Sequence, residues 1–98
     1  MEKKKAHYPL DQIQALVQAG AVQATRTALG DAAALGLRFS DMKDVIKNLK
    51  PSDLYKSMTS HYDNKIWQDV YHYPTLNYDL YIKLQIVKDV VIVSFKER

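Results

Sequence analysis

The spacing of hydrophobic residues changes at Pro51, and this change constrains the fold more than any other feature of the chain. Before Pro51 the apolar residues recur at helical spacing, as in the run Leu10, Ile13, Leu16 and Val17. After Pro51 they alternate with polar residues, which is typical of strands with one buried face. Without a linker or an internal repeat, residues 1–98 are expected to form a single domain.

The periodicity predicts an α+β fold, with three N-terminal helices packed on one face of a small twisted antiparallel sheet. Residues 1–8 are expected as a loose basic arm, 9–50 as the helical half and 51–98 as the sheet half. Within the first half, Asp11, Ser40, Gly20 and Gly36 are the expected helix caps and stops. The expected helices cover about 11–19, 22–35 and 41–49, and the expected strands cover 55–58, 66–72, 80–86 and 90–96.

Composition excludes several chemistries. The chain has no cysteine, which excludes disulfides, a thiolate zinc site and a cysteine nucleophile. The three histidines (His7, His61 and His72) lack metal-ligand spacing, so we expect neither a metal nor a cofactor. No apolar run approaches the ~20 residues of a membrane span, and no apolar segment follows the basic N-terminus. A cytoplasmic protein without membrane contact is the expectation.

The net charge of +3 is too small to identify an anionic partner, so a local site would have to bind one. Strand periodicity places four polar residues on one face of the sheet, provided that the strands pair in a suitable register. These residues are Lys56, Gln68, Tyr81 and Lys96. Two ammonium groups, a phenol and an amide suit RNA, because lysines bind phosphate and amides bind 2′-hydroxyls or base edges.

A second interpretation stays open at this point. Any antiparallel sheet with one solvated face carries lysine, glutamine and tyrosine on it, and the register is assumed. His72, at the end of the second expected strand, is either a substrate contact or a solvated side chain. Lys3–Lys5 is either a solubilising tail or an arm that touches phosphate.

Three segments of the chain resemble one known family. They are Ser52-Asp53-Leu54-Tyr55-Lys56-Ser57-Met58-Thr59, Ile66-Trp67-Gln68-Asp69-Val70-Tyr71 and Val91-Ile92-Val93-Ser94-Phe95-Lys96-Glu97. In order and spacing they are similar to the MqsR family, the motility quorum-sensing regulator toxins of type II toxin–antitoxin systems. The resemblance extends through the N-terminal half, at Gln18-Ala19-Gly20 and Thr25-Arg26-Thr27-Ala28-Leu29.

The resemblance implies a RelE-like fold and an mRNA interferase, which cleaves single-stranded mRNA at GCU-like sites independently of the ribosome. It implies catalytic roles for Lys56, Gln68, Tyr81 and Lys96. Tyr55, His72 and Lys83 are expected to bind substrate, although His72 stands where the family pattern has arginine. The implied partner is an MqsA-like antitoxin with a zinc-binding N-terminal domain and a helix-turn-helix domain.

Without a metal, RNA cleavage uses the 2′-hydroxyl as the nucleophile and leaves a 2′,3′-cyclic phosphate. Lys56 and Lys96 would stabilise charge, Gln68 would orient the nucleotide, and Tyr81 would move a proton as acid or base. The alternative function is a non-catalytic regulator that binds RNA or a protein through the open sheet face.

Overall fold

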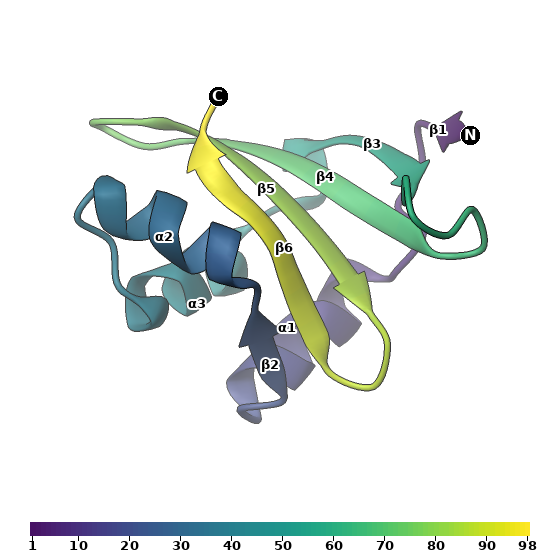
Figure 1. Cartoon of the computed structure of the whole chain (residues 1–98), viewed down its shortest axis with the longest axis horizontal. Coiled ribbons are helices and arrows are strands. Elements are labelled where there is room, and N and C mark those ends of the chain that lie inside the picture. The colour runs from purple at the N-terminus through teal and green to yellow at the C-terminus, as the bar shows by residue number, and fades with distance from the viewer.

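The computed structural model describes all 98 residues and contains three helices and a six-stranded sheet (Figure 1). In chain order the elements are β1 (Glu2–Lys3), α1 (Leu10–Gln18), β2 (Val22–Ala24), α2 (Arg26–Ala34), α3 (Phe39–Asn48), a 3-10 turn (Pro51–Asp53), β3 (Leu54–Thr59), β4 (Trp67–Pro74), β5 (Asp79–Ile86) and β6 (Val90–Glu97). The α+β composition agrees with the prediction. The predicted order, with all helices ahead of the sheet, was wrong because β1 precedes α1 and β2 precedes α2.

The sheet has the strand order β1-β3-β4-β5-β6-β2 and is mixed, not antiparallel throughout. Four of its five pairings are antiparallel, whereas β2 runs parallel to β6, with Val22 beside Val90. Both edge strands therefore come from the first quarter of the chain, and the four strands between them come from the second half. Figure 1 shows β1 beside β3 and β2 beside β6.

The strand β2 occupies residues that the sequence predicted as the start of a helix. Val22 is a buried β-branched residue, and its pairing with β6 satisfies backbone groups that a helix would otherwise satisfy. The helix α2 begins only after Thr25, whose Oγ1 accepts a hydrogen bond from the Ala28 amide at 3.0 Å. The Thr25 hydroxyl also donates to the Val93 carbonyl, so this cap ties α2 to β6.

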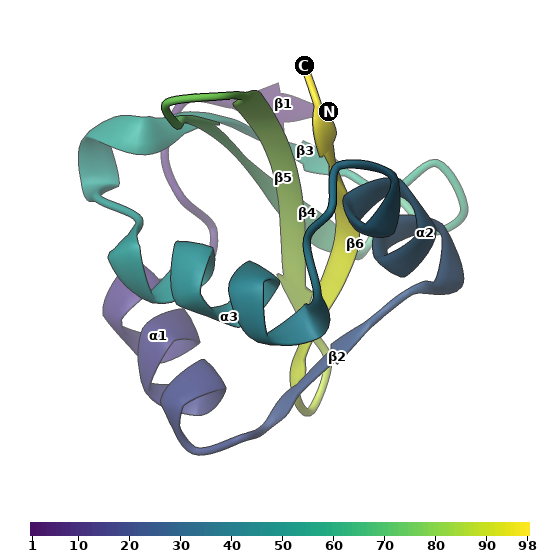
Figure 2. The same ribbon diagram turned by 90° about the vertical axis from the view of Figure 1, so that its left-hand side faces the viewer.

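All three helices lie on one side of the sheet (Figures 1 and 2). The core between the two layers contains Ile13 and Val17 of α1, Ala28 and Ala32 of α2, Met42 and Ile46 of α3, and the inward residues of the sheet such as Leu80, Ile82, Leu84, Ile92 and Phe95. The inward residues of β5 are even-numbered, so Tyr81, Lys83 and Gln85 project from the opposite face. None of the helices is long and apolar enough to cross a membrane.

The N-terminal segment is held against the sheet by the buried carboxylate of Asp69. This carboxylate accepts hydrogen bonds from the backbone amides of His7, at 3.0 Å, and Tyr8, at 2.9 Å. The Ser57 hydroxyl lies within hydrogen-bonding reach of both Asp69 and the Lys5 carbonyl. Residues 1–8, expected as a loose arm, thus contain the paired strand β1 and two backbone amides fixed by Asp69.

Candidate active site

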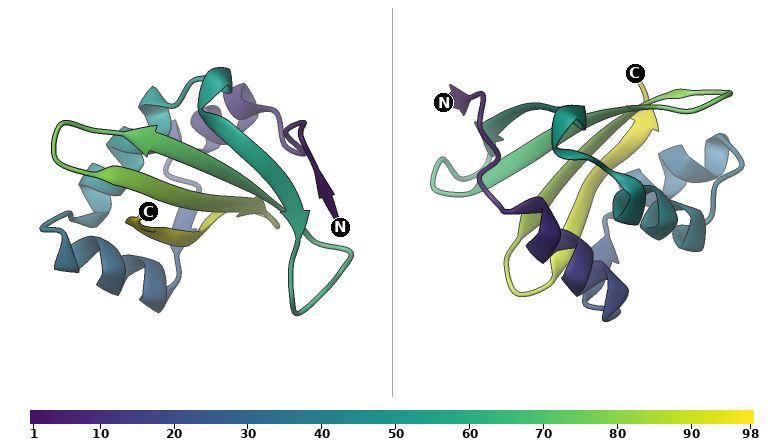
Figure 3. Two further views of the ribbon diagram at one scale, coloured as in Figure 1. Left: turned by 90° about the horizontal axis from the view of Figure 1, so that it is seen from above. Right: turned by 180° about the vertical axis from the view of Figure 1, so that it is seen from behind.

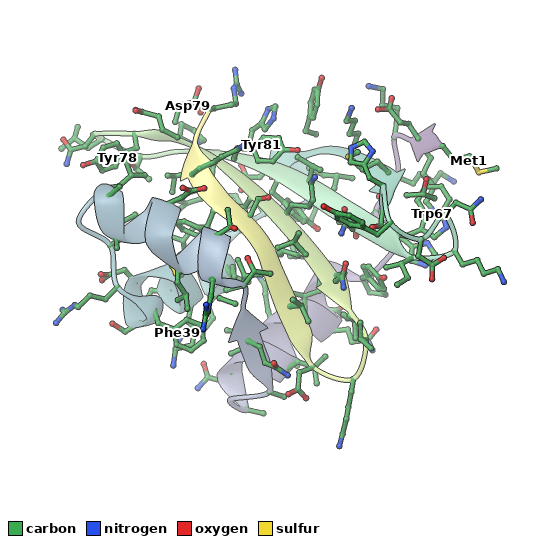
Figure 4. All side chains as sticks on the ribbon, in the orientation of Figure 1. Met1, Phe39, Trp67, Tyr78, Asp79 and Tyr81 are labelled. Atoms are coloured by element: carbon green, nitrogen blue, oxygen red, sulfur yellow. The ribbon has the colours of Figure 1, made fainter.

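The sheet face opposite the helices carries all seven residues that the sequence singled out. Figure 3 shows this face in its left panel, with the helices behind the sheet, and Figure 4 shows Tyr81 on this side of the sheet. The antiparallel register aligns the even residues of β4 with the odd residues of β5, and it aligns Ser94 and Lys96 of β6 with Lys83 and Tyr81. In β3 the register shifts between Leu54 and Lys56, so that Tyr55 and Lys56 both reach the open face.

One row across the face consists of aromatic rings and ends in a lysine. Tyr81 has His72 as its cross-strand partner on β4 and Lys96 on β6. The His72 ring stacks on Tyr55 with a centroid distance of 4.2 Å and lies 5.9 Å from the Tyr81 ring. The Lys96 ammonium lies 5.4 Å from the centroid of the Tyr81 ring. The row therefore places a phenol directly between an imidazole and an ammonium group.

The next row places two lysines on either side of a buried valine. Lys56 and Lys83 are the cross-strand partners of Val70, which is fully buried although it lies on the open face. Lysine stems cover apolar surface while their ammonium groups stay in water, which accounts for the burial of Val70. Two lysines therefore flank one small apolar residue, and we call this pair of lysines the phosphate seat.

Gln68 shares this face but lies apart from the first row. It precedes His72 by four residues on β4, a spacing of about 13 Å along the strand. Its amide donates to Gln85 Oε1 at 2.8 Å, and the side chain is buried. The alternation of side chains along β4 thus places Gln68 on the open face, but Gln68 does not lie beside Tyr81 and Lys96.

One charged residue at this site could not be predicted from the sequence pattern. Glu2, on β1, pairs with Met58 in the sheet and forms an ion pair with Lys56. The hydrogen bond from Lys56 lowers the pKa of the Glu2 carboxyl, and the same bond raises the pKa of Lys56. Because Glu2 and Lys56 are far apart in the chain, only knowledge of the β1–β3 pairing would have identified this contact.

The surroundings of the titratable groups on this face shift their pKa values in different directions. Burial raises the pKa of Tyr81, although the nearby Lys56 ammonium opposes that effect, so the phenol stays protonated near neutrality. Burial, together with the Lys96 and Lys56 charges, lowers the pKa of Lys83. Burial and the charge of Arg98 lower the pKa of His72, which favours a neutral imidazole.

The tautomer of His72 follows from its partner. The Arg98 guanidinium lies 2.8 Å from His72 Nδ1 and can only donate, so Nδ1 accepts and Nε2 carries the proton. Arg98 itself is held by an ion pair with Asp79. No group of three or more His, Asp or Glu side chains, here or elsewhere in the molecule, is arranged to hold a metal ion.

Together, the helical layer and the lysine-bearing open face of the sheet define a two-layer α+β protein. Comparison with known proteins is more specific. Residues 5–97 match the family described as "Motility quorum-sensing regulator, toxin of MqsA", and the chain belongs to this family. It is also 49% identical, over all 98 residues of both chains, to the "mRNA interferase toxin MqsR" of Escherichia coli (strain K12). The family predicted from the sequence motifs is thereby confirmed, and the name of this relative agrees with the predicted class of enzyme.

Proposed function

We propose that this protein is an endoribonuclease toxin that cleaves single-stranded mRNA at GCU-like sites, without the ribosome and without a metal ion. The observation that carries the proposal is the open sheet face, where a phenol and a neutral imidazole lie among three lysines. Membership of a toxin family and similarity to an mRNA interferase support it. Growth arrest would follow because cleaved mRNA can no longer be translated.

In the proposed reaction the 2′-hydroxyl attacks the adjacent phosphorus, the bond to the 5′-oxygen breaks, and a 2′,3′-cyclic phosphate remains. Lys56 and Lys96 stabilise the negative charge of the phosphorane from two sides. The raised pKa of Tyr81 makes its phenol a hydrogen-bond donor to a phosphate oxygen and not a base. Lys83 lies beside Lys56 in the phosphate seat and binds the same group.

The remaining residues bind the nucleotides on either side of the scissile bond. Tyr55 is exposed and already stacked on His72, so it offers an aromatic ring to an unstacked base. The Nε2–H group of His72 donates a hydrogen bond to a phosphate oxygen or a 2′-hydroxyl. Gln68, some distance along β4, is suited to orient a flanking nucleotide through its amide.

We also propose that a cognate antitoxin neutralises the toxin. The family description, "toxin of MqsA", supports a partner of the MqsA type, with a zinc-binding N-terminal domain and a helix-turn-helix domain. Co-expression tests this directly: growth arrest caused by the toxin should be relieved by the partner, and both proteins should elute together in gel filtration. Arrest that persists despite a soluble partner would contradict this part of the proposal.

Cleavage of a short RNA that contains one GCU sequence tests the catalytic proposal. The wild type should cut it in the presence of EDTA and leave a cyclic phosphate, whereas Tyr81→Phe and Lys56→Ala should lose activity by about 100-fold or more. Tyr62→Phe, at the fully exposed tip of the β3–β4 hairpin, serves as the matched control. RNA binding without cleavage by the wild type would favour the regulator, and 5′-phosphate products would refute the reaction class.

A further inference from the structure

Lys83 occupies the centre of the open face, and its surroundings differ from those of the other two lysines. Its cross-strand partners are Val70 on β4 and Ser94 on β6, so it has strands on both sides. Lys56 is neutralised by Glu2, and Lys96 is exposed near the end of β6. Lys83 is partly buried and makes neither an ion pair nor a hydrogen bond.

Every element around Lys83 contributes groups that face it, and hardly any of them is an anion. The titratable and polar neighbours are Tyr55 and Lys56 of β3, Gln68 and His72 of β4, Tyr81 and Gln85 of β5, Ser94 and Lys96 of β6, and Glu2 of β1. The only carboxylate among them, that of Glu2, is bound to Lys56. The Lys83 ammonium therefore has two cationic neighbours and no counter-ion until RNA binds.

We propose that Lys83 is the general acid of the cleavage step and donates its ammonium proton to the departing 5′-oxygen. The inference rests on the proposed endoribonuclease function. The 2′-oxygen forms a bond to phosphorus and loses its proton to water, while the bond between phosphorus and the 5′-oxygen breaks. The electron pair of that bond stays on the 5′-oxygen, which takes the Lys83 proton, and water then reprotonates the neutral amine.

Two other proton donors on the face, Tyr81 and Lys56, are less suited to this step. The raised pKa values of Tyr81 and Lys56 make both groups weaker acids than they are in water. The pKa of Lys83 is shifted in the opposite direction, since burial and two ammonium groups disfavour its charged form. Lys56 and Lys83 flank Val70 in the sheet register, so a phosphate bound between them has one lysine to hold its charge and another to give up a proton.

An RNA in which sulfur replaces the bridging 5′-oxygen tests this assignment, because a thiolate leaves without protonation. Single-turnover rates are measured on the sulfur and oxygen substrates for the wild type, Lys83→Arg, Lys83→Met and the control Lys88→Met, a change at an exposed turn. Both Lys83 variants should cleave the oxygen substrate about 100-fold or more slowly than the wild type. Lys83→Arg, which keeps the charge that binds phosphate, should cleave the sulfur substrate at close to the wild-type rate, and Lys88→Met should match the wild type on each substrate.

The outcomes separate the two proposals. If the wild type cleaves neither substrate, the proposed function fails. If the wild type cleaves both and Lys83→Arg stays slow on the sulfur substrate, the acid role is overturned. Full activity of Lys83→Arg on the oxygen substrate would also overturn it, because a permanent charge would then be sufficient. Binding of an RNA with a 2′-deoxy residue at the cleavage site should be retained by Lys83→Arg, which shows that the variant is folded.

Discussion

Replacing Asp69 by alanine is expected to lower the free energy of unfolding by about 3 kcal/mol, because it removes the acceptor that holds the N-terminal segment. The backbone amides of His7 and Tyr8 each lose a charge-assisted hydrogen bond, which contributes about 1.5 kcal/mol at the low end of its usual range. The Ser57 hydroxyl adds little to the loss, since its single proton can go to the Lys5 carbonyl. For a domain whose total stability is about 5–15 kcal/mol, this is a large effect.

Two measurements check the Asp69 prediction. Urea denaturation gives the change in free energy, and the fluorescence of Trp67, the single tryptophan, reports the release of the segment. His7 stacks on the Trp67 ring at 5.3 Å, and the Lys3 ammonium lies 4.1 Å from its centroid. Figure 4 shows Trp67 on the same side of the molecule as Met1. Loss of the contacts should therefore shift the emission before global unfolding.

A matched control for this change is Asp44→Ala, because Asp44 is an exposed helical carboxylate with one surface ion pair to Lys47. Its effect should stay below about 0.5 kcal/mol. The reasoning fails if Asp69→Ala is destabilised by less than 1 kcal/mol and keeps the wild-type emission. In that case the carboxylate would not be what fixes the segment.

Three further changes should have measurable effects. Glu2→Gln removes the carboxylate that forms an ion pair with Lys56, so it should tighten binding of a cleavage-resistant RNA a few-fold, as measured by fluorescence anisotropy. Weaker binding would mean that Glu2 positions Lys56 for RNA. Thr25→Ala removes a helix cap and should cost about 1–2 kcal/mol in urea denaturation, so an unchanged midpoint would contradict the cap. Arg98→Gln should raise the pKa of His72 in an NMR titration, because it removes a positive charge beside the ring. The folded-state pKa of His72 lies below the ordinary value of 6.5, so protonating this ring is less favourable in the folded protein than in the unfolded chain. The free energy of unfolding should therefore fall as the pH drops from 6.5 through the lower folded-state pKa.

The residues of the open face could be predicted because strand periodicity is a local property. Leu80, Ile82 and Leu84 alternate with Tyr81 and Lys83, and this alternation alone fixes which side chains face the helices. The register across strands is not local. The register determines that His72 and Lys96 are the neighbours of Tyr81 and that Gln68 is not one of them. The sequence pattern contains no information on the register.

The two edge strands were missed for a related reason. Val22–Ala24 precedes an alanine-rich segment, whose helix propensity favoured extending the helix through it. The β-branched Val22 and the capping residue Thr25 are local signals that favour a later start of the helix. For Glu2–Lys3, no local signal exists, because its strand character depends entirely on a partner in the second half of the chain.

The origin of the edge strands in the first quarter of the chain has a consequence for the order of folding. The hairpins that join β3, β4, β5 and β6 close short loops, whereas the pairings of Glu2 with Met58 and Val22 with Val90 close long ones. Long closures cost more entropy and form later, so the four central strands should assemble first. Lys56 and Lys83 would then flank Val70 before β1 docks, and the Glu2 carboxylate would reach Lys56 only after the four central strands are in place.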